Sequence, residues 1–362
     1  MNACIFLPNW LGDLTMATPA LRAMRERFGP NARLVGILRP HLTGLLAGTD
    51  WLDELWPYHP KAGQGERIST WTLARRMRAE RFDLALLLTN SFRTGLAAAL
   101  GRAKTRVGYA RYGRRYLLTD PISPPRREGR IRPEPVVDSY LRLTRHLGCP
   151  PGSRQLELAV TPAEAAEGER AWTAAGLRDD RPVVALNCSG AYGAAKLWPP
   201  EHFATLAQLL VDRLGHQVLV ICGPADAERQ RARAIAAQAD RENVVSLADG
   251  PLGIGVTKAT LARCRMLIST DSGPRHVGAA LGLPVVTVMG PTDSIWIANP
   301  TIRGVDVRHD ALPCLGCARR TCPLGHHRCM RELSAERVFG AAAQVLATEP
   351  SKTEDKRRGD AA

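Results

Sequence analysis

A short apolar run followed by an amphipathic stretch recurs along the first 150 residues, and the same alternation starts again at Pro182. Short apolar runs rich in β-branched residues indicate strands, and longer stretches with a period near 3.6 residues indicate helices. Strands alternating with helices favour βαβ units and a parallel sheet. In the first half we expect strands at Ala3–Pro8, Leu34–Leu38, Asp83–Thr89 and Thr105–Tyr109, and helices at Leu14–Phe28, Ser69–Glu80, Ser91–Leu100 and Val136–Leu147.

The second half repeats the pattern. We expect strands at Pro182–Asn187, Gln217–Cys222, Arg265–Ser269 and Val285–Met289, and helices at Pro200–Leu214, Asp226–Gln238, Gly273–Leu281 and Ser334–Thr348. Thr161–Ala175 is also expected to be helical, because Thr161 can cap it and Pro162 suits the first turn. Pro121–Pro135, with five prolines and several arginines, is expected to be a loop.

The predicted fold class is α/β, with two Rossmann-like, doubly wound parallel-sheet domains that face a central cleft. We place the first domain at 1–165, a connector at 166–180, the second domain at 181–349 and a disordered tail at 350–362. A length of 362 residues agrees with two domains of ~150 residues each. Such sheets bind ligands at the carboxyl ends of their strands, so the residues that follow strands are the candidates for chemistry.

Composition excludes several classes of protein. Hydrophobic residues make up 45% and charged residues 23%, which is ordinary for a globular chain. No apolar run approaches the ~18 residues of a membrane span, and the N-terminus lacks a basic region before its apolar stretch, so we expect a cytoplasmic protein. The nine cysteines are odd in number and five are scattered, which is unlike a secreted disulfide framework.

The positive charge is concentrated. The net charge is +14, and the window 93–132 holds eleven basic residues against two acidic ones. Such a patch attracts phosphate-bearing partners, whether nucleic acid, anionic lipid headgroups or a phosphorylated substrate. The alternative is a solvated surface in a chain that uses 43 Arg and 6 Lys. Gly113 and the flanking tyrosines suggest an exposed turn that presents Arg111, Arg114 and Arg115 together.

Three segments that follow predicted strands carry candidate site residues. Asp13 follows the first strand beside Gly12, where a carboxylate either projects into the cleft or simply favours the start of a helix. A Gly-rich loop from Ser189 ends at Lys196, which suits a diphosphate but lacks P-loop spacing; an ordinary surface loop is the alternative. Thr270, Asp271, Ser272, Gly273 and His276 lie at the start of a predicted helix, an anion-binding position at which Asp271 and Ser272 could equally act as caps.

Four cysteines lie close together near the end of the chain. Their spacing is Cys314-x2-Cys317-x4-Cys322-x6-Cys329, with His326 and His327 between the last two. This spacing is compatible with zinc ligands but does not match the common two-knuckle pattern. A redox-active or purely structural thiol cluster is an equal alternative.

Taken together, these segments resemble glycosyltransferase family 9, the ADP-heptose:lipopolysaccharide heptosyltransferases, and within it the heptosyltransferase II branch. The matching stretches are LPNWLGDLTMATPALRAMR, KLWPPEHFATLA, STDSGPRHVGAALGLPVVTVMGPTD and CLGCARRTCPLGHHRCM. They occur in the expected order over nearly the whole chain. The resemblance implies a GT-B fold with an N-terminal acceptor domain and a C-terminal ADP-sugar domain. The chain departs from many relatives at Arg275, where they carry an apolar residue; this arginine is expected either to alter contacts to the diphosphate or to point outward.

The resemblance also implies site roles and partners. Asp13 matches the family's catalytic base, Lys196 its diphosphate-binding lysine, and Asp271 to His276 its nucleotide-sugar loop. The expected partners are ADP-heptose and an anionic inner-core acceptor at the cytoplasmic face of the inner membrane. Inverting transfer needs a base for the acceptor hydroxyl and donors for the departing ADP. Because no two aspartates have D-x-D spacing, we expect no metal at the diphosphate and no cofactor.

Three alternatives remain open at this point. Two are enzymes, namely a family 9 transferase for another sugar and a GT-B sugar-nucleotide epimerase. The third is a basic nucleic-acid-binding protein with the cysteines as a zinc module. Aromatic residues are only 5% of the chain, and in the basic window only Tyr109, Tyr112 and Tyr116 interleave with arginines. Nucleic acid is therefore not expected as a partner.

Overall fold

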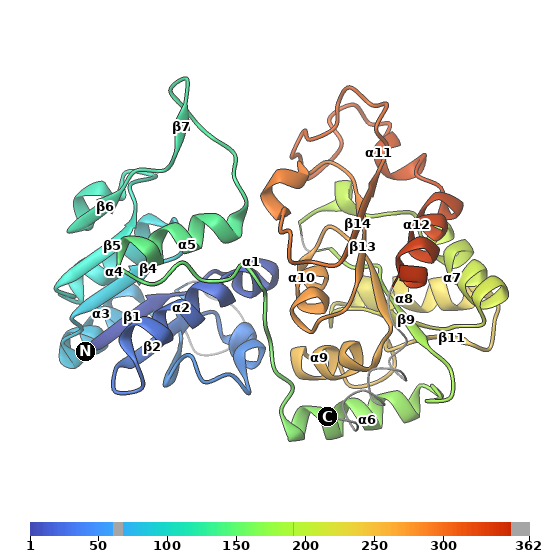
Figure 1. Ribbon diagram of the computed structural model, residues 1–362, viewed down its shortest axis with the longest axis horizontal. Helices are drawn as coiled ribbons and strands as arrows, with labels where there is room; N and C mark the ends of the chain where they lie inside the picture. Colours follow the sequence, from blue (N-terminus) through green and yellow to red (C-terminus); the bar gives the residue numbers. More distant parts are fainter. Residues whose placement is uncertain (61–67, 191, 349–362) are drawn as a thin grey trace. The chain divides into compact units, whose positions relative to one another are not determined.

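The computed structural model describes residues 1–60, 68–190 and 192–348 and divides the chain into two compact units. The first unit comprises Met1–Ala159 and Ile295–Thr301, and the second comprises Val160–Ser294 and the chain from Ile302 onward. Each unit is built around a parallel sheet with helices on its faces (Figure 1). The α/β fold class is therefore confirmed. The predicted tail at 350–362 lies outside the described residues.

The first unit contains a six-stranded parallel sheet in the order β3-β2-β1-β4-β5-β6. Its strands are β1 (Asn2–Phe6), β2 (Arg33–Leu38), β3 (Glu54–Pro57), β4 (Leu84–Leu87), β5 (Thr105–Tyr109) and β6 (Asp120–Ile122). Its helices are α1 (Leu11–Met16), α2 (Thr18–Phe28), α3 (Thr70–Glu80), α4 (Phe92–Leu100) and α5 (Val136–His146), with short turns η1 (Pro40–Leu46) and η2 (Arg114–Leu117).

The second unit repeats this topology, with the order β11-β10-β9-β12-β13-β14. Its strands are β9 (Val183–Asn187), β10 (Gln217–Ile221), β11 (Val244–Ser246), β12 (Met266–Thr270), β13 (Val285–Met289) and β14 (Gly304–Arg308). Its helices are α6 (Pro162–Ala174), α7 (Pro200–Leu214), α8 (Asp226–Ala239), α9 (Ile254–Arg263), α10 (Gly273–Ala280), α11 (Arg328–Arg331) and α12 (Ala335–Thr348), with the turn η3 (Ala194–Lys196). The turn η4 (Ser294–Ile297) begins at Ser294 of this unit, and its other residues belong to the first unit.

Both sheets have a topological switch point. The strand order reverses between β1 and β4 in the first unit and between β9 and β12 in the second, and both pairs are parallel. In an open α/β sheet, ligands bind outside the carboxyl ends of the strands at this point. The places to look are therefore the segments after β1 and β4 and those after β9 and β12.

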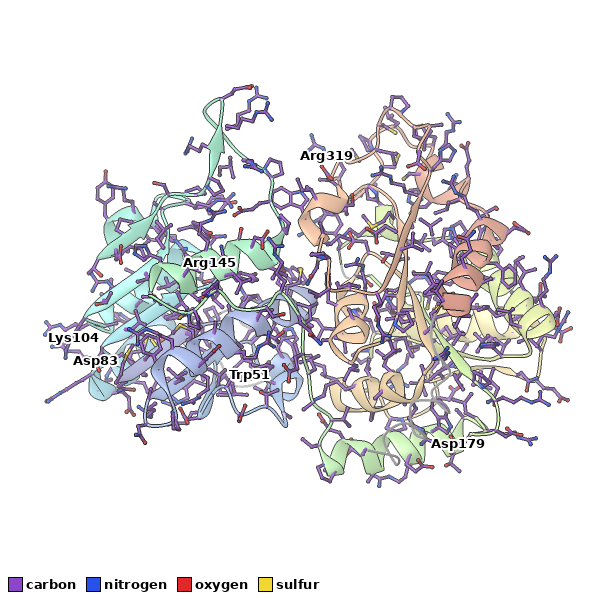
Figure 2. The ribbon with its side chains drawn as sticks, viewed as in Figure 1. Trp51, Asp83, Lys104, Arg145, Asp179 and Arg319 are labelled. Carbon is purple, nitrogen blue, oxygen red and sulfur yellow. The ribbon has the colours of Figure 1, made fainter. Side chains whose placement is uncertain are left out.

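Opposite charges occupy the amino-terminal edge of the first sheet. Asp83, just before β4, accepts a hydrogen bond from the backbone N–H of Asn2 at 3.0 Å and pairs with Lys104 at 2.8 Å (Figure 2). Arg33, at the start of β2, pairs with Glu54 at 2.7 Å and with Glu80 at 2.9 Å. The ionic groups at this edge thus have partners within the protein.

Two expectations about the first unit were wrong in detail. The helix expected at Leu14–Phe28 is divided into α1 and α2, because Pro19 in the first turn of α2 has no N–H to continue the helix. The segment Pro121–Pro135 is not wholly a loop, since it contains the end of β6 and a hairpin of β7 (Arg126–Arg127) and β8 (Arg130–Ile131). This hairpin projects from the rest of the unit (Figure 1).

Helix α6 lies in the second unit and packs against α9. Thr161 and Glu164 form a capping box at its start. Glu164 also pairs with the fully buried ammonium of Lys258 on α9 at 2.9 Å. The two helices touch closely, because a Cβ added to Gly168 would lie 2.4 Å from Cβ of Ala259.

Among the described residues, no helix is both long enough and apolar enough to cross a membrane.

Candidate active site

The loop after β9 brings Lys196 to the loop after β12. Nζ of Lys196 lies 2.6 Å from Oδ2 of Asp271 and donates to the Asp271 carbonyl at 3.0 Å. The ammonium also lies 4.6 Å from the centre of the Tyr192 ring. Both members of the Lys196–Asp271 pair are largely buried. The lysine therefore lies at the switch point of the second sheet, fixed by a carboxylate rather than free.

Asn187, at the end of β9, connects the two loops. Its Nδ2 donates to Oγ of Ser269 at 2.9 Å and to Oγ of Ser272 at 2.8 Å. Ser272 is the N-cap residue of α10, but its side chain makes no capping hydrogen bond to that helix. Pro274 has no N–H, and the Arg275 N–H donates to the Ser272 carbonyl at 3.2 Å. Gly273 is therefore the first-turn residue whose N–H can meet an anion, which the helix dipole favours at this position.

Burial and charge set the protonation of the groups beneath this surface. Burial alone would raise the pKa of the Asp271 carboxyl, but the charge and hydrogen bond of Lys196 outweigh it and the pKa is lowered. Burial, assisted by the charge of Arg275, lowers the pKa of His276 to about 3. At neutral pH the site therefore contains a Lys196–Asp271 ion pair and a neutral imidazole.

The structure brings the predicted donor-site residues together, but at different depths. Thr270, Asp271 and His276 are buried, whereas Ser272 and Gly273 are partly exposed. Thr270 donates through its hydroxyl to the Ser189 carbonyl at 3.1 Å. The buried members therefore support the loops, and the partly exposed ones face solvent.

The expectation that Arg275 points outward was wrong, because its side chain is 5% exposed and turns into the sheet. The alternative, that it alters contacts to the diphosphate, stays a prediction. Nε of Arg275 donates to Thr287 on β13 at 2.7 Å, and its Nη2 pairs with Asp306 on β14 at 3.3 Å. A guanidinium in the first turn of α10 thus fastens that helix to the edge of the sheet.

The cysteine-rich segment 314–329 supports the Lys196 loop. The N–H of Ala195 donates to the Arg320 carbonyl at 3.0 Å, and Nε2 of His327 lies 2.7 Å from the Ala195 carbonyl. The Tyr192 hydroxyl donates to the Ala318 carbonyl at 2.6 Å. A Cβ added to Gly193 would lie 2.5 Å from the Arg320 carbonyl oxygen, so the two backbones are in close contact.

Among the described residues, Cys314, Cys317, Cys322 and Cys329 form no disulfide. Zinc binding by this segment stays a prediction. Within the part of the chain that the structure describes, no three His, Cys, Asp or Glu side chains come together as metal ligands. Backbone N–H groups lower the pKa of Cys322, with His327 the first of them. The contacts of this segment with the Lys196 loop are the hydrogen bonds of Ala195 with Arg320 and His327.

Asp13 lies in the first turn of α1, directly after the switch point of the first sheet. Trp10, the N-cap residue, makes no side-chain capping bond. Burial raises the pKa of Tyr140 on α5 well above its usual value, and the charge of Asp13 adds to this effect. The Asp13 carboxylate is therefore close enough to the Tyr140 hydroxyl to oppose its ionisation.

The expectation that Arg114 is presented beside Arg111 and Arg115 was wrong. Arg115 is exposed and Arg111 is partly exposed, but Arg114 is 0% exposed. Gly113, at φ +73°, turns the chain so that Arg114 points inward at the start of η2. Its guanidinium donates to the carbonyls of Tyr109 and Thr89 and to Oδ1 of Asn90.

Three residues that were not singled out from the sequence, Asn187, Tyr192 and Arg320, lie around the Lys196 and Asp271 loops. Asn187 carried a signal, because it is a polar side chain at the end of an otherwise apolar strand after which a loop begins. Tyr192 and Arg320 carried none, since their stacking at 5.6 Å depends on the contact between segments far apart in the sequence.

The comparisons with known proteins bear on the family and the fold of the chain. The family model described as "Glycosyltransferase family 9 (heptosyltransferase)" matches residues 70–327. Lipooligosaccharide heptosyltransferase 2 of Campylobacter jejuni is 26% identical over 350 residues, covering 96% of this chain and 98% of that protein. The solved family 9 glycosyl transferase of Veillonella parvula has a TM-score of 0.80 at 22% identity, with 96% of this chain and 97% of that chain covered. The solved E. coli ADP-heptose LPS heptosyltransferase II has a TM-score of 0.76 at 24% identity, with 97% and 100% covered.

Two Rossmann-like units, one with a helix N-terminus beside a lysine at its switch point, define a GT-B glycosyltransferase fold, which the solved structures share. Within that class, the matched model covers more than two thirds of the chain. The chain belongs to glycosyltransferase family 9.

Proposed function

We propose that the chain transfers heptose from ADP-heptose to the inner core of lipopolysaccharide, with inversion at the anomeric carbon, as a heptosyltransferase II. The observation that carries this proposal is the match to proteins named heptosyltransferase 2, which extends over nearly all of this chain and of the first such relative. A match of that extent includes both units, and so both the donor and the acceptor side.

In the proposed reaction Asp13 is the general base. It removes the proton of the acceptor hydroxyl as the oxygen attacks the anomeric carbon and the bond to ADP breaks on the opposite face. A carboxylate at the start of α1, beside the switch point, suits this role, because the positive end of a helix favours a negative charge.

The second unit binds the ADP that leaves. Negative charge develops on the diphosphate as the glycosidic bond breaks, and fixed donors stabilise it. The Gly273 N–H at the start of α10 and the Lys196 ammonium supply these donors. Two of the three N–H groups of Lys196 are directed at Asp271, so Asp271 positions the ammonium rather than contacting the ligand.

The proposed partners include the membrane that carries the acceptor. On the first unit, η2 exposes Arg115 and Tyr116, and the neighbouring Tyr112 is also exposed. The β7–β8 hairpin adds exposed Arg126, Arg127 and Arg130. Arginines attract anionic headgroups, and tyrosines favour the boundary between headgroups and acyl chains. This surface would hold the protein at the cytoplasmic face of the inner membrane as a peripheral protein.

The proposal is tested by incubating the purified protein with ADP-heptose and a truncated lipopolysaccharide core that carries one heptose. We expect the mass of the core to increase by one heptose and ADP to be released. The alternatives give other results. A family 9 transferase for another sugar would leave this core unchanged and use a different nucleotide sugar, and an epimerase would alter the donor without an acceptor.

Asp13→Asn tests the proposed base. The substitution preserves shape but removes the proton acceptor, so we expect kcat to fall by about 10²–10⁴-fold with the melting temperature and the affinity for ADP unchanged. Turnover is measured from ADP release under acceptor saturation. Turnover close to that of the parent would leave Asp13 only the role of stabilising the start of α1.

A further inference from the structure

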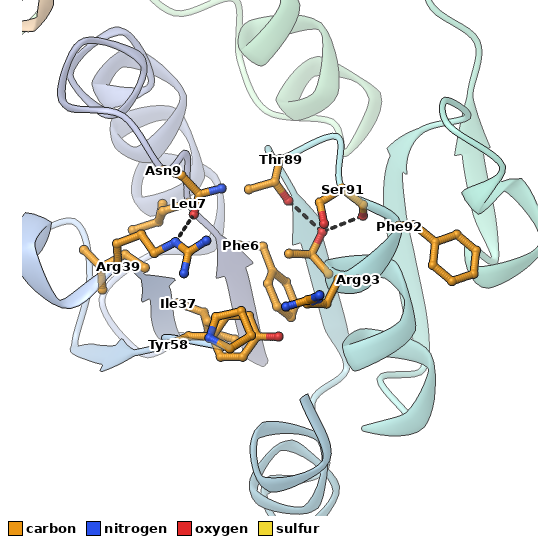
Figure 3. A pocket seen from close by; sticks show the side chains of 13 residues that line it. Phe6, Leu7, Asn9, Ile37, Arg39, Tyr58, Thr89, Ser91, Phe92 and Arg93 are labelled. Atoms are coloured by element: carbon orange, nitrogen blue, oxygen red, sulfur yellow. Dashed lines mark hydrogen bonds between the residues drawn. The ribbon is translucent and has the colours of Figure 1, made fainter. Parts of the chain in front are cut away.

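The first unit contains a pocket of about 490 Å³ at the carboxyl end of its sheet (Figure 3). Its apolar base includes Phe6 at the end of β1, Ile37 on β2 and Tyr58 after β3. Its rim is polar and includes Arg39 and Arg93. The volume is in the range of small-molecule sites, ~300–1,000 Å³. The pocket therefore has room for about one sugar residue and its substituents.

The two arginines at the rim lack acidic partners. Arg39 donates through Nε to Oδ1 of Asn9 at 3.0 Å (Figure 3), a neutral contact. Among the described residues neither Arg39 nor Arg93 forms an ion pair, and the described lining of the pocket contains no aspartate or glutamate. Other arginines of this unit are paired, since Arg22 and Arg25 lie 2.7 Å from Glu157 and Asp53.

A third guanidinium lies behind the wall of the pocket. Arg114 donates to the carbonyl of Thr89, which lines the pocket, as well as to Tyr109 and Asn90. Burial lowers the pKa of Arg114 to about 10, so it stays protonated at neutral pH. Within the described part of the chain, the hydrogen bonds of its guanidinium go to neutral oxygens. A buried cation without a carboxylate is costly, and an anion in the pocket would offset that cost.

The start of α4 adds hydrogen-bond donors on the same side. Ser91 is its N-cap residue, but its side chain makes no capping bond. Thr94 donates its hydroxyl to the Ser91 carbonyl at 2.9 Å and accepts from Thr89 at 2.8 Å (Figure 3). The N–H groups of the first turn are thus left for a ligand at the positive end of the helix dipole.

We propose that this pocket binds the acceptor through an anionic substituent, a carboxylate or a phosphate monoester, held by Arg39 and Arg93. The inference rests on the proposed function, and deepens it by naming the pocket and the two arginines that hold the anionic group of the acceptor. The wall of the pocket at Leu7 and Asn9 continues directly into α1, which carries Asp13. An acceptor anchored there would have its sugar next to the proposed base.

Arg39→Gln and Arg93→Gln test the pocket. Because each removes one charge-assisted contact, we expect each to raise the acceptor KM about tenfold or more, and the double variant to raise it further. Affinity for ADP, measured by calorimetry, should change less than twofold. Arg93→Lys should recover part of the loss. Arg78→Gln, an exposed arginine on α3 away from the pocket, is the matched control and should leave KM unchanged.

Modified acceptors distinguish the two anions. One core acceptor is treated with phosphatase, and another is methyl-esterified at its sugar-acid carboxylates. One of the two treatments removes the anion that the pocket binds. On that acceptor the parent should have a higher KM, equal to the KM of the arginine variants. If the variants equal the parent on the unmodified acceptor, or keep the same deficit on both modified acceptors, the proposal is wrong.

Failure of the proposed function gives a different result. Calorimetric binding of the O-deacylated core to the parent and to both arginine variants needs no ADP-heptose. If the parent transfers no heptose yet binds this core more tightly than the variants do, the proposed reaction is wrong and the anion pocket stands. If the parent transfers heptose and all variants bind the core equally, the pocket is wrong and the reaction stands.

Discussion

Lys196 has two roles that substitution separates. Its ammonium is proposed to hold the diphosphate, and it also compensates the buried carboxylate of Asp271 at 2.6 Å. Removal of one partner of a buried pair costs more than removal of both, because it leaves an uncompensated charge. Loss of activity in a Lys196 variant therefore has to be separated from loss of stability.

We expect Lys196→Ala to lower the free energy of unfolding by about 3–5 kcal/mol and to weaken ADP binding. Lys196→Ala/Asp271→Asn should recover stability but not ADP affinity. Urea unfolding and calorimetry with ADP measure the two effects. Lys104→Ala is the control, because its pair with Asp83 is exposed and should be worth less than about 1 kcal/mol. Unchanged ADP affinity in Lys196→Ala would remove this lysine from the donor site.

His276 makes stability depend on pH. Its pKa is about 3 in the folded protein and its ordinary value is 6.5, so between these values the unfolded chain binds more protons. Stability from this group is complete above pH 6.5 and is lost as pH falls toward 3. Between pH 7 and pH 5 the parent should lose about 2 kcal/mol through this group.

In His276→Gln the free energy of unfolding, measured with urea at pH 7, 6 and 5, should therefore fall less as the pH is lowered. The two proteins are compared by the change of this free energy with pH, because the other titrating groups contribute equally to both. Parallel slopes would mean that the buried imidazole becomes protonated without penalty.

At the scale of elements, α6 and α9 depend on a single carboxylate. Glu164 accepts the backbone N–H of Thr161 at 2.9 Å within the capping box, and it pairs with the buried Lys258. One side chain thus starts α6 and joins it to α9.

We expect Glu164→Ala to lower the free energy of unfolding by about 3 kcal/mol or more, since it affects both the cap and a buried charge. Glu167→Ala, at an exposed position of the same helix, should change it by less than about 0.5 kcal/mol. Denaturant titration followed by circular dichroism compares the two. Similar losses in both variants would mean that the pair with Lys258 contributes nothing.

Elements with a long apolar run or clear periodicity could be predicted from the sequence. The strands at the centre of each sheet and most helices agree with the structure because their burial imposes a pattern. β14 was missed because GVDVR has only two apolar residues and is an edge strand. The division at Pro19 was missed because proline is also ordinary in a first turn.

The sequence indicates which candidate residues follow strands, but it does not indicate which of the nearby side chains are buried. Asp13, Lys196 and Asp271 follow strands, which the sequence indicates. The sequence does not indicate that Arg114 and Arg275 turn inward, because neighbouring arginines look alike until backbone geometry, such as φ +73° at Gly113, orients each. Tertiary contacts therefore determine which arginines are surface residues.

At the scale of the whole molecule, part of the positive charge is exposed on one surface of the first unit and part is buried. The net charge is +14, and the exposed share on η2 and the β7–β8 hairpin is the part proposed to contact anionic lipid. Arg114 does not belong to that share, so a charge-reversal test has to avoid it.

We expect Arg111→Glu/Arg115→Glu to reduce binding to phosphatidylglycerol vesicles at least tenfold at 0.1 M salt, at about 1 kcal/mol per basic residue. Arg78→Glu is the exposed control on α3. The difference should shrink at 1 M salt, where the Debye length falls from ~10 to ~3 Å, and should be absent with phosphatidylcholine. If the parent, the double variant and Arg78→Glu cosediment equally with these vesicles at low salt, Arg111 and Arg115 do not contact the lipid.

The contacts of Arg114 have a consequence for how the protein tolerates mutation. Two of the acceptors that hold its guanidinium are the backbone carbonyls of Tyr109 and Thr89. A side-chain replacement at 89 or 109 leaves a carbonyl in place, whereas a carboxylate partner would be lost by one codon change. Substitutions at these neighbouring positions therefore leave the acceptors of the buried guanidinium in place. Position 114 itself does not share this tolerance, because even lysine lacks the planar guanidinium that reaches separate acceptors.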